Sequence, residues 1–186
     1  YDADQINDRI KQAVNDTRGQ VISYNGELPY AWFFAHAGGI TELPSVALDY
    51  DKPDPGYTQV IESPDSDKAP TNVKNWTASF SAADVVAAAK ETGVDIGTLS
   101  SISIGKKGES GRAATLLING REVSAPAFRV ALDSKVLKSM LLSDVQFEGG
   151  KVTFTGKGYG HGVGMSQWGA YGMAESGSNY EQIIAH

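Results

Sequence analysis

The residues best suited to chemistry lie in a glycine-crowded stretch at 156–169, which reads GKGYGHGVGMSQWG. Glycine has no Cβ, so such a backbone adopts positive φ and lets another chain or a ligand approach closely. An imidazole, a hydroxyl and an amide presented there suit an uncharged, hydroxyl-rich ligand such as a glycan. The candidate binding residues of this stretch are Tyr159, Gly160, His161, Ser166 and Gln167.

Two other interpretations of the stretch remain open. The loop is structural if His161 is only a satisfied histidine and Ser166 only caps the next helix. Trp168 is then a core residue rather than a stacking platform for sugars. A phosphate-binding loop is disfavoured, because the glycine spacing does not fit the dinucleotide pattern and no Lys-Ser/Thr pair follows.

A second stretch, at 35–42, reads AHAGGITE and follows an apolar run. It places the titratable side chains of His36 and Glu42 beside the flexible pair Gly38-Gly39. A glutamate in a loop is usually solvated, so Glu42 is a candidate acid only by its position.

The periodicity of the chain predicts an α+β fold: one domain, a mainly antiparallel sheet with hairpins, and flanking helices. A helix at 2–17, capped by Asp2 or Asp4 with Gln5, is followed by strands at 20–24 and 28–35 around Asn25-Gly26. The second strand is nearly all apolar, so we expect it to be buried on both faces. The later elements are expected at 81–93 (helix), 99–105, 113–118, 121–124, 144–147 and 151–155 (strands), and 166–176 and 179–186 (helices).

Two stretches are less regular. Five of the seven prolines fall within 43–75, which predicts a long surface loop, either solvated or acting as a lid or rim over a substrate. Residues 126–141 are expected to be short mixed segments, with Phe128, Val130, Leu132 and Val136 in the core.

Composition excludes several classes of function. The chain has no cysteine, which excludes disulfides, thiolate metal sites and thiol nucleophiles within it. A net charge of -6 without a basic stripe argues against nucleic acid as a partner. The sequence starts at Tyr1 rather than Met and stops at His186 inside a helical pattern, so we expect a piece of a longer protein.

The glycine stretch, extended to Ala170, resembles the signature of the SpoIID/LytB family. Residues 13–14, 17–21 and 24–26 match that family's AV-TRGQV-YNG segment, and 37–42 is similar to its SGG-TE turn, with Ala37 where Ser is usual. Further matches in the family's order are Ser110-Gly111-Arg112, Phe128-Arg129 and Lys138-Ser139. The resemblance spans the whole of 1–186.

The resemblance implies an extracytoplasmic protein that acts on peptidoglycan glycan strands, located in the cell wall or anchored to the membrane by a segment before Tyr1. SpoIID-like members look like lytic transglycosylases, which cleave strands stripped of stem peptides and leave 1,6-anhydro ends. One glutamate of raised pKa serves as general acid and then as base. LytB-like members imply an alternative: a non-catalytic module that enhances an amidase and works with other cell-wall hydrolases.

The chain departs from the family in one respect. The family's glutamate lies in an EALKAQAVAARTYA helix, and some members bind zinc through His and Cys; both features belong upstream of Tyr1. We therefore expect no cofactor, no metal site and no assigned catalytic acid within 1–186. The expected cleft has His161, Ser166 and Gln167 on one wall and the turn Gly38-Gly39-Ile40-Thr41-Glu42 on the other, with Gly38, Gly39 and Thr41 as its candidate binding residues. Changing Glu42 to Gln should leave activity largely intact.

Overall fold

The computed structural model describes residues 6–186, which divide between Tyr30 and Ala31 into two compact units. In the first unit, helix α1 (Asp8–Asp16) begins after Asn7, whose side chain accepts a hydrogen bond from the backbone N of Ile10 at 3.1 Å. The expected caps at Asp2, Asp4 and Gln5 lie outside the described residues. Asn25 and Gly26 have φ of 52° and 86° and form the predicted turn, but this turn closes a single bridge instead of a hairpin.

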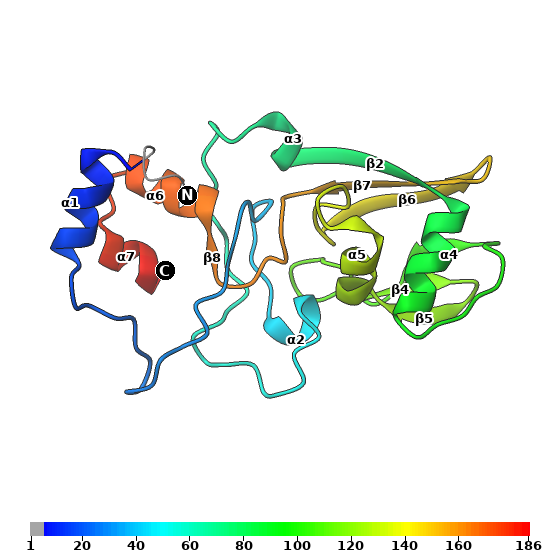
Figure 1. Ribbon diagram of the computed structural model, residues 1–186, viewed down its shortest axis with the longest axis horizontal. Coiled ribbons are helices and arrows are strands. Elements are labelled where there is room, and N and C mark those ends of the chain that lie inside the picture. Colours follow the sequence, from blue (N-terminus) through cyan, green and yellow to red (C-terminus); the bar gives the residue numbers. More distant parts are fainter. Residues whose placement is uncertain (1–5) are drawn as a thin grey trace. The chain divides into compact units, whose positions relative to one another are not determined.

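Two three-stranded antiparallel sheets give the second unit its core (Figure 1). One has the order β2-β7-β6, with β2 (Asn75–Ser81), β7 (Lys151–Lys157) and β6 (Leu142–Glu148). The other has the order β3-β4-β5, with β3 (Ile102–Ile104), β4 (Thr115–Ile118) and β5 (Arg121–Ser124). The predicted α+β class with antiparallel pairing is confirmed.

Helices α4 (Ala82–Glu91) and α5 (Ala125–Asp133) pack on these sheets. The start of α4 is the predicted one: Ser81 and Asp84 form a capping box, and Gly93 follows with a φ of 87°. The main core is apolar and includes Trp76, Val85, Leu116, Ile118, Val123, Phe128, Leu137, Val152 and Phe154.

The remaining elements are short. Strands β1 (Phe33–Phe34) and β8 (Met165–Ser166) pair in parallel, and β8 leads directly into α6 (Gln167–Glu175) and then α7 (Tyr180–Ala185). Single-turn helices α2 (Pro44–Ala47) and α3 (Thr71–Lys74) lie at the two ends of the proline-rich segment.

Three expectations need correction. The strand expected at 28–35 is only the two residues of β1, and it is buried on one face only. Successive side chains of a strand point to opposite faces: Phe34, which packs against the ring of His161, is 4% exposed, whereas Phe33 is 59% exposed. Residues 125–133 form one helix, α5, whose inward face carries Phe128. Val130 and Val136 therefore lie at the surface, 69% and 43% exposed, instead of in the core.

The segment 43–75 is largely irregular between α2 and α3, as its prolines predict. It is also anchored to the rest of the unit, since Thr58, Ser66 and Ala69 are buried and the side chain of Asp65 is only 6% exposed. In the part of the chain that the structure describes, no helix combines the length and apolar character needed to cross a bilayer.

Candidate functional site

The glycine loop leaves β7 and runs beside residues 32–38. Tyr159 and His36 exchange two backbone hydrogen bonds, with N···O distances of 3.0 and 2.9 Å. Farther along, the N–H of Met165 donates to the carbonyl of Trp32 at 3.1 Å, and that of Trp168 donates to Ala35 at 3.0 Å. The two stretches that stood out in the sequence are therefore neighbours, held together by their main chains.

Close main-chain packing explains most of the glycines. A Cβ at Gly158, Gly160 or Gly164 would lie 2.7 Å from the His36 oxygen, 2.6 Å from the Phe34 Cβ and 2.3 Å from the Trp32 oxygen, respectively. All three glycines also have positive φ, between 73° and 114°. Each of these positions excludes a side chain for steric and conformational reasons.

Gly162 packs against a different partner, the guanidinium of Arg112. A Cβ at Gly162 would lie 2.4 Å from Arg112 Nε. Arg112 is 1% exposed, and its Nη atoms donate to the carbonyls of Ile40 at 2.7 Å and Ala37 at 2.5 Å and to Ser110 Oγ at 3.2 Å. Its Nε has no hydrogen-bond partner within residues 6–186. Burial lowers the pKa of Arg112 to about 10, against the opposing effect of Glu42 and Asp65, so the group remains a cation at neutral pH.

His161 is partly buried at the edge of the loop. Its Nδ1 accepts a hydrogen bond from the backbone N of Val163 at 3.0 Å, and its ring lies 5.5 Å from that of Phe34. Burial, followed by the positive charge of Arg129, lowers its pKa to about 4. A backbone hydrogen bond with Phe33 raises this pKa, and the charge of Arg112 lowers it further. At neutral pH the imidazole is therefore uncharged.

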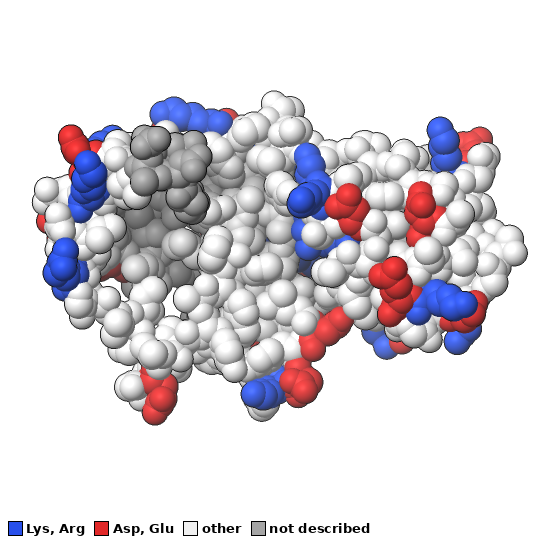
Figure 2. Space-filling model, viewed as in Figure 1, with Lys and Arg blue, Asp and Glu red and all other residues white. Residues whose placement is uncertain are grey.

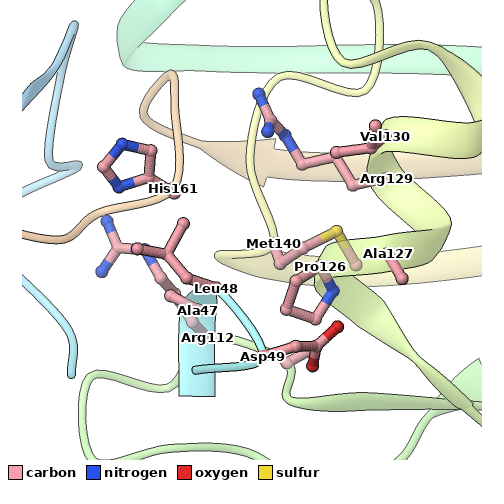
Figure 3. A pocket seen from close by; sticks show the side chains of 11 residues that line it. Ala47, Leu48, Asp49, Arg112, Pro126, Ala127, Arg129, Val130, Met140 and His161 are labelled. Atoms are coloured by element: carbon pink, nitrogen blue, oxygen red, sulfur yellow. The ribbon is translucent and has the colours of Figure 1, made fainter. Parts of the chain in front are cut away.

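His161 and Arg112 lie on one side of a pocket of about 250 Å³, with Pro126, Ala127 and Met140 on the other (Figure 3). We call this the histidine pocket. Its lining is mostly small and apolar, with Arg129 and Asp49 as its further charged residues. The lining residues are Ala47, Leu48, Asp49, Arg112, Ala113, Pro126, Ala127, Arg129, Val130, Met140 and His161.

Both arginines of the histidine pocket also organise the backbone around it. Arg129 donates to the carbonyls of Leu137, Ser134 and Lys138 at 2.9–3.0 Å, which fixes the turn that follows α5. On the face drawn in Figure 2, the Lys and Arg side chains near the middle lie beside Asp and Glu side chains. The histidine pocket itself is lined by two arginines and one aspartate.

Glu42 lies inside the protein. It is 0% exposed: its Oε2 accepts from Ser110 Oγ at 2.6 Å and from Ser110 N at 3.2 Å, and its Oε1 accepts from Leu43 N at 2.9 Å. A Cβ at Gly108 would lie 2.2 Å from Oε2, so the carboxylate is covered on that side too. Both carboxylate oxygens are engaged, which gives Glu42 a place in the scaffold and no surface from which to reach a sugar.

Ser166 and the 36–39 turn meet at a buried aspartate, Asp65. Its Oδ1 accepts from Ser166 Oγ at 2.6 Å and Ala37 N at 3.3 Å, and its Oδ2 accepts from Gly39 N at 3.1 Å. Ser166 is also the N-cap of α6. His36 Nδ1 accepts from Gly38 N at 2.9 Å, and Asp65 Oδ2 lies 3.4 Å from the same nitrogen.

The neutral form of His36 best fits this geometry, because an Nδ1 that accepts a hydrogen bond carries no proton. Burial, opposed by Asp65 and aided by Lys74, lowers the pKa of His36. The contact between His36 and Asp65 is therefore not a salt bridge at neutral pH, and the carboxylate is held by hydroxyl and amide donors instead.

The other predicted residues are distributed around these features. Thr41 is buried and pairs with residues 59–61 through Oγ1 and its backbone. Gln167 is exposed at the first position of α6, and the ring of Tyr159 lies 5.8 Å below Lys138 Nζ. Gly38 borders a second pocket, which we call the lysine pocket, of about 350 Å³; it is lined by Gly38, Ile40, Lys107, Ser110, Gly111, Leu141, Leu142, Ser143 and Lys157.

Comparisons with known proteins agree over nearly the whole chain. Residues 46–164 match a family model described as a domain of unknown function, DUF8618. The chain is 31% identical over 182 residues to the stage II sporulation protein D of Bacillus amyloliquefaciens, and 31% over 185 residues to that of Bacillus subtilis (strain 168). It is 28% identical over 222 residues to the amidase enhancer of Bacillus subtilis (strain 168). Each alignment covers 96% of this chain.

The chain belongs to the DUF8618 family, whose model it matches over residues 46–164, and its similarity to the sporulation proteins and the amidase enhancer supports its place in the SpoIID/LytB family. It spans 48% and 49% of the two sporulation proteins and 31% of the amidase enhancer. The signature that identified the family in the sequence is the loop described above. The structure shows that its glycines serve packing against residues 32–38 and Arg112, while its histidine borders a pocket.

Of the residues predicted for the SpoIID/LytB site, the structure places His161 on the histidine pocket and Gly38 on the lysine pocket. Arg112 and Asp65 were not predicted to take part. Arg112 could have been noticed, because a basic residue in the family's Ser-Gly-Arg match needs an explanation; Asp65 could not, because nothing distinguishes it from the other acidic residues of 43–75. Within residues 6–186, no three His, Asp or Glu side chains cluster in a way that could hold a metal ion.

Proposed function

We propose that this chain is the glycan-binding part of a protein that remodels peptidoglycan outside the cytoplasm. The names of the relatives, which concern sporulation and the enhancement of an amidase, support a cell-wall role. The observation that carries the proposal is the histidine pocket, which the family's signature loop borders. A mostly apolar hollow with a few fixed polar groups suits the N-acetyl group and hydroxyls of an amino sugar.

The family signature contributes to this pocket in a specific way. Gly162 lets the loop lie on Arg112, and this contact sets His161 against the hollow. Because the imidazole is neutral at pH 7 and its Nδ1 accepts from Val163, it offers a glycan an aromatic edge rather than a positive charge. The polar contacts of the ring hold it in place, which preorganises the wall of the pocket.

For the whole protein, we propose lytic cleavage of strands stripped of stem peptides. A carboxylic acid protonates the glycosidic oxygen as the C1–O bond breaks; the resulting carboxylate then removes the proton of the sugar's 6-hydroxyl as O6 bonds to C1, which gives a 1,6-anhydro end. Glu42 is enclosed by Ser110, Leu43 and Gly108, so we place the acid on the family's glutamate helix and not on Glu42.

The test of glycan binding fills the histidine pocket. Ala127→Phe puts an aromatic ring into the hollow, and Ala174→Phe, at an exposed position of helix α6, is the matched control. We expect Ala127→Phe to weaken binding of peptide-free glycan strands at least tenfold by calorimetry, and Ala174→Phe to leave it unchanged. Wild-type affinity in a folded Ala127→Phe protein would contradict the proposal.

A second function, that of a non-catalytic module assisting another cell-wall hydrolase, is favoured by the enclosure of Glu42. This function requires the same pocket and no acid. It is distinguished by incubating the longest natural form of the protein with peptide-free strands. Anhydro ends in the products support cleavage, whereas their absence, combined with faster cleavage by an added amidase, supports the assisting role.

A further inference from the structure

The lysine pocket lies next to the histidine pocket. Ser110 and Gly111 border the lysine pocket, while Arg112 and Ala113, the next two residues, border the histidine pocket. The turn that carries all four is well fixed: Lys107 and Ala113 form a β-bridge, Gly108 N donates to the Arg112 carbonyl at 2.9 Å, and Gly111 N donates to Gly108 at 3.0 Å. The two pockets therefore share one fixed turn of the backbone.

Two exposed lysines from separate elements, Lys107 and Lys157, line this second pocket. Lys157 ends β7, and its N–H donates to the Leu141 carbonyl at 3.0 Å. Its Cβ lies 3.3 Å from the position that a Cβ at Gly38 would occupy, so the absence of a side chain at Gly38 leaves room for the lysine stem. The backbones that carry both ammonium groups are thus held in place.

The charge of the two lysines is not balanced inside the pocket. Neither forms an ion pair with any residue from 6 to 186, and no carboxylate is among the lining residues. Glu42 lies behind Ser110, in the cluster that also contains Arg112, so its charge already has a cation nearby. Glu109 is exposed on the same turn and is the acidic group closest in sequence.

Several other polar groups of the lining already donate their hydrogen bonds to protein acceptors. The backbone N–H groups of Gly38 and Gly111 donate to His36 Nδ1 and to Gly108, and Ser143 Oγ donates to the Thr155 carbonyl at 3.1 Å. Recognition of an anion therefore falls to the ammonium groups, which act as point charges. Ile40, Leu141 and Leu142 supply an apolar surface beside them.

We propose that the lysine pocket binds the free lactyl carboxylate of N-acetylmuramic acid, with the methyl group of the lactyl ether against Ile40, Leu141 and Leu142. This inference rests on the proposed function, because it takes the ligand to be a peptidoglycan strand. A stem peptide converts that carboxylate into an amide and adds bulk. The pocket therefore selects sugars from which the stem peptide has been removed.

The test compares three tetrasaccharides by calorimetry: a neutral one of N-acetylglucosamine, one with alternating muramic acid and free lactyl carboxylates, and the latter with its carboxylates amidated. We expect the wild-type chain to bind the free-acid tetrasaccharide about tenfold more tightly than the other two. This factor corresponds to the summed binding free energies of two exposed ion pairs. Raising the salt concentration from about 0.05 M to about 0.3 M should reduce this preference, because added ions screen exposed charges.

The variant that tests the site is Lys107→Gln/Lys157→Gln, with Lys151→Gln, at the other end of β7, as the control. The double variant should bind all three ligands with the affinity of the neutral one, while the control keeps the preference. An unchanged preference in the double variant, or no preference in the wild type, would overturn the lactyl inference and leave the proposed function standing. If none of the three ligands binds, the proposed function itself fails.

A further arm separates a carboxylate from a phosphate, since two lysines attract either. Inorganic phosphate and acetate are added at equal ionic strength to the wild-type chain bound to the free-acid tetrasaccharide. Equal, weak competition supports a site built for a carboxylate on a sugar. Strong competition by phosphate alone would show a phosphate site and overturn the proposal.

Discussion

Replacing Gly162 with alanine tests whether the signature loop is held by Arg112. Two costs add at this position. Gly162 has a φ of 93°, and an L-residue there costs about 1–2 kcal/mol. A Cβ 2.4 Å from Arg112 Nε also forces either the loop or the guanidinium to move, and overpacking of this kind costs about 1–3 kcal/mol. The guanidinium is fully buried and bonded to two carbonyls, so it has little room to yield. We expect a total loss of about 2–5 kcal/mol.

Gly120→Ala is the matched control, because Gly120 has a φ of 74° but nothing within 4 Å of its added Cβ. That change should cost about 1–2 kcal/mol, from conformation alone. In a domain of this size these values correspond to a fall in Tm of about 10 °C for Gly162→Ala and about 5 °C for Gly120→Ala. Thermal unfolding followed by circular dichroism measures both. Equal falls in the two variants would refute the steric reasoning, since only conformation would then matter.

Two further predictions concern titratable groups. The pKa of His161 is about 4 in the folded chain and 6.5 ordinarily, so below pH 6.5 the unfolded chain binds a proton that the folded chain does not; stability is full above pH 6.5 and falls as the pH drops toward 4. His161→Asn should reduce by about 2 kcal/mol the loss of stability between pH 7 and pH 4.5 in urea unfolding. A slope unchanged by His161→Asn would show that the ring is not desolvated. Glu42→Gln should cost about 1–3 kcal/mol of stability, because an amide cannot accept all three hydrogen bonds, while peptide-free glycan is still bound with wild-type affinity; a loss of binding in the folded variant would place Glu42 in the site.

The elements that the sequence predicted well are those specified by local chemistry. The Ser81–Asp84 capping box, the Asn119-Gly120 turn and the Gly149-Gly150 turn each need only a few adjacent residues, and all appear where expected. The strand at 28–35 failed because its length depends on a partner. β8 offers it two residues, so the aromatic run around Phe33 pairs only briefly and stays exposed on one side.

The candidate site was predicted in part for a similar reason. The glycine spacing at 156–164 marks a place where backbones come close, but it does not say what comes close. Residues 32–38 and Arg112 fill that space in the structure. Asp65 could not be predicted, because it lies in a proline-rich segment that looks solvated in the sequence. Its carboxylate is buried only because Ser166, Ala37 and Gly39, all distant in sequence, donate hydrogen bonds to it.

The pairing of β1 with β8 has a consequence for how the protein becomes active. Residues 33–38 and their partners at 159–168 are separated by more than a hundred residues, which include both three-stranded sheets and helices α4 and α5. Closing so long a segment is entropically unfavourable until the intervening chain is compact, so we infer that the signature loop docks late in folding. A nascent chain on the ribosome therefore carries no finished site until residues 159–168 have emerged. Pulsed hydrogen exchange checks this: the amide of Tyr159 should gain protection after those of β4 and β5, and earlier protection would contradict it.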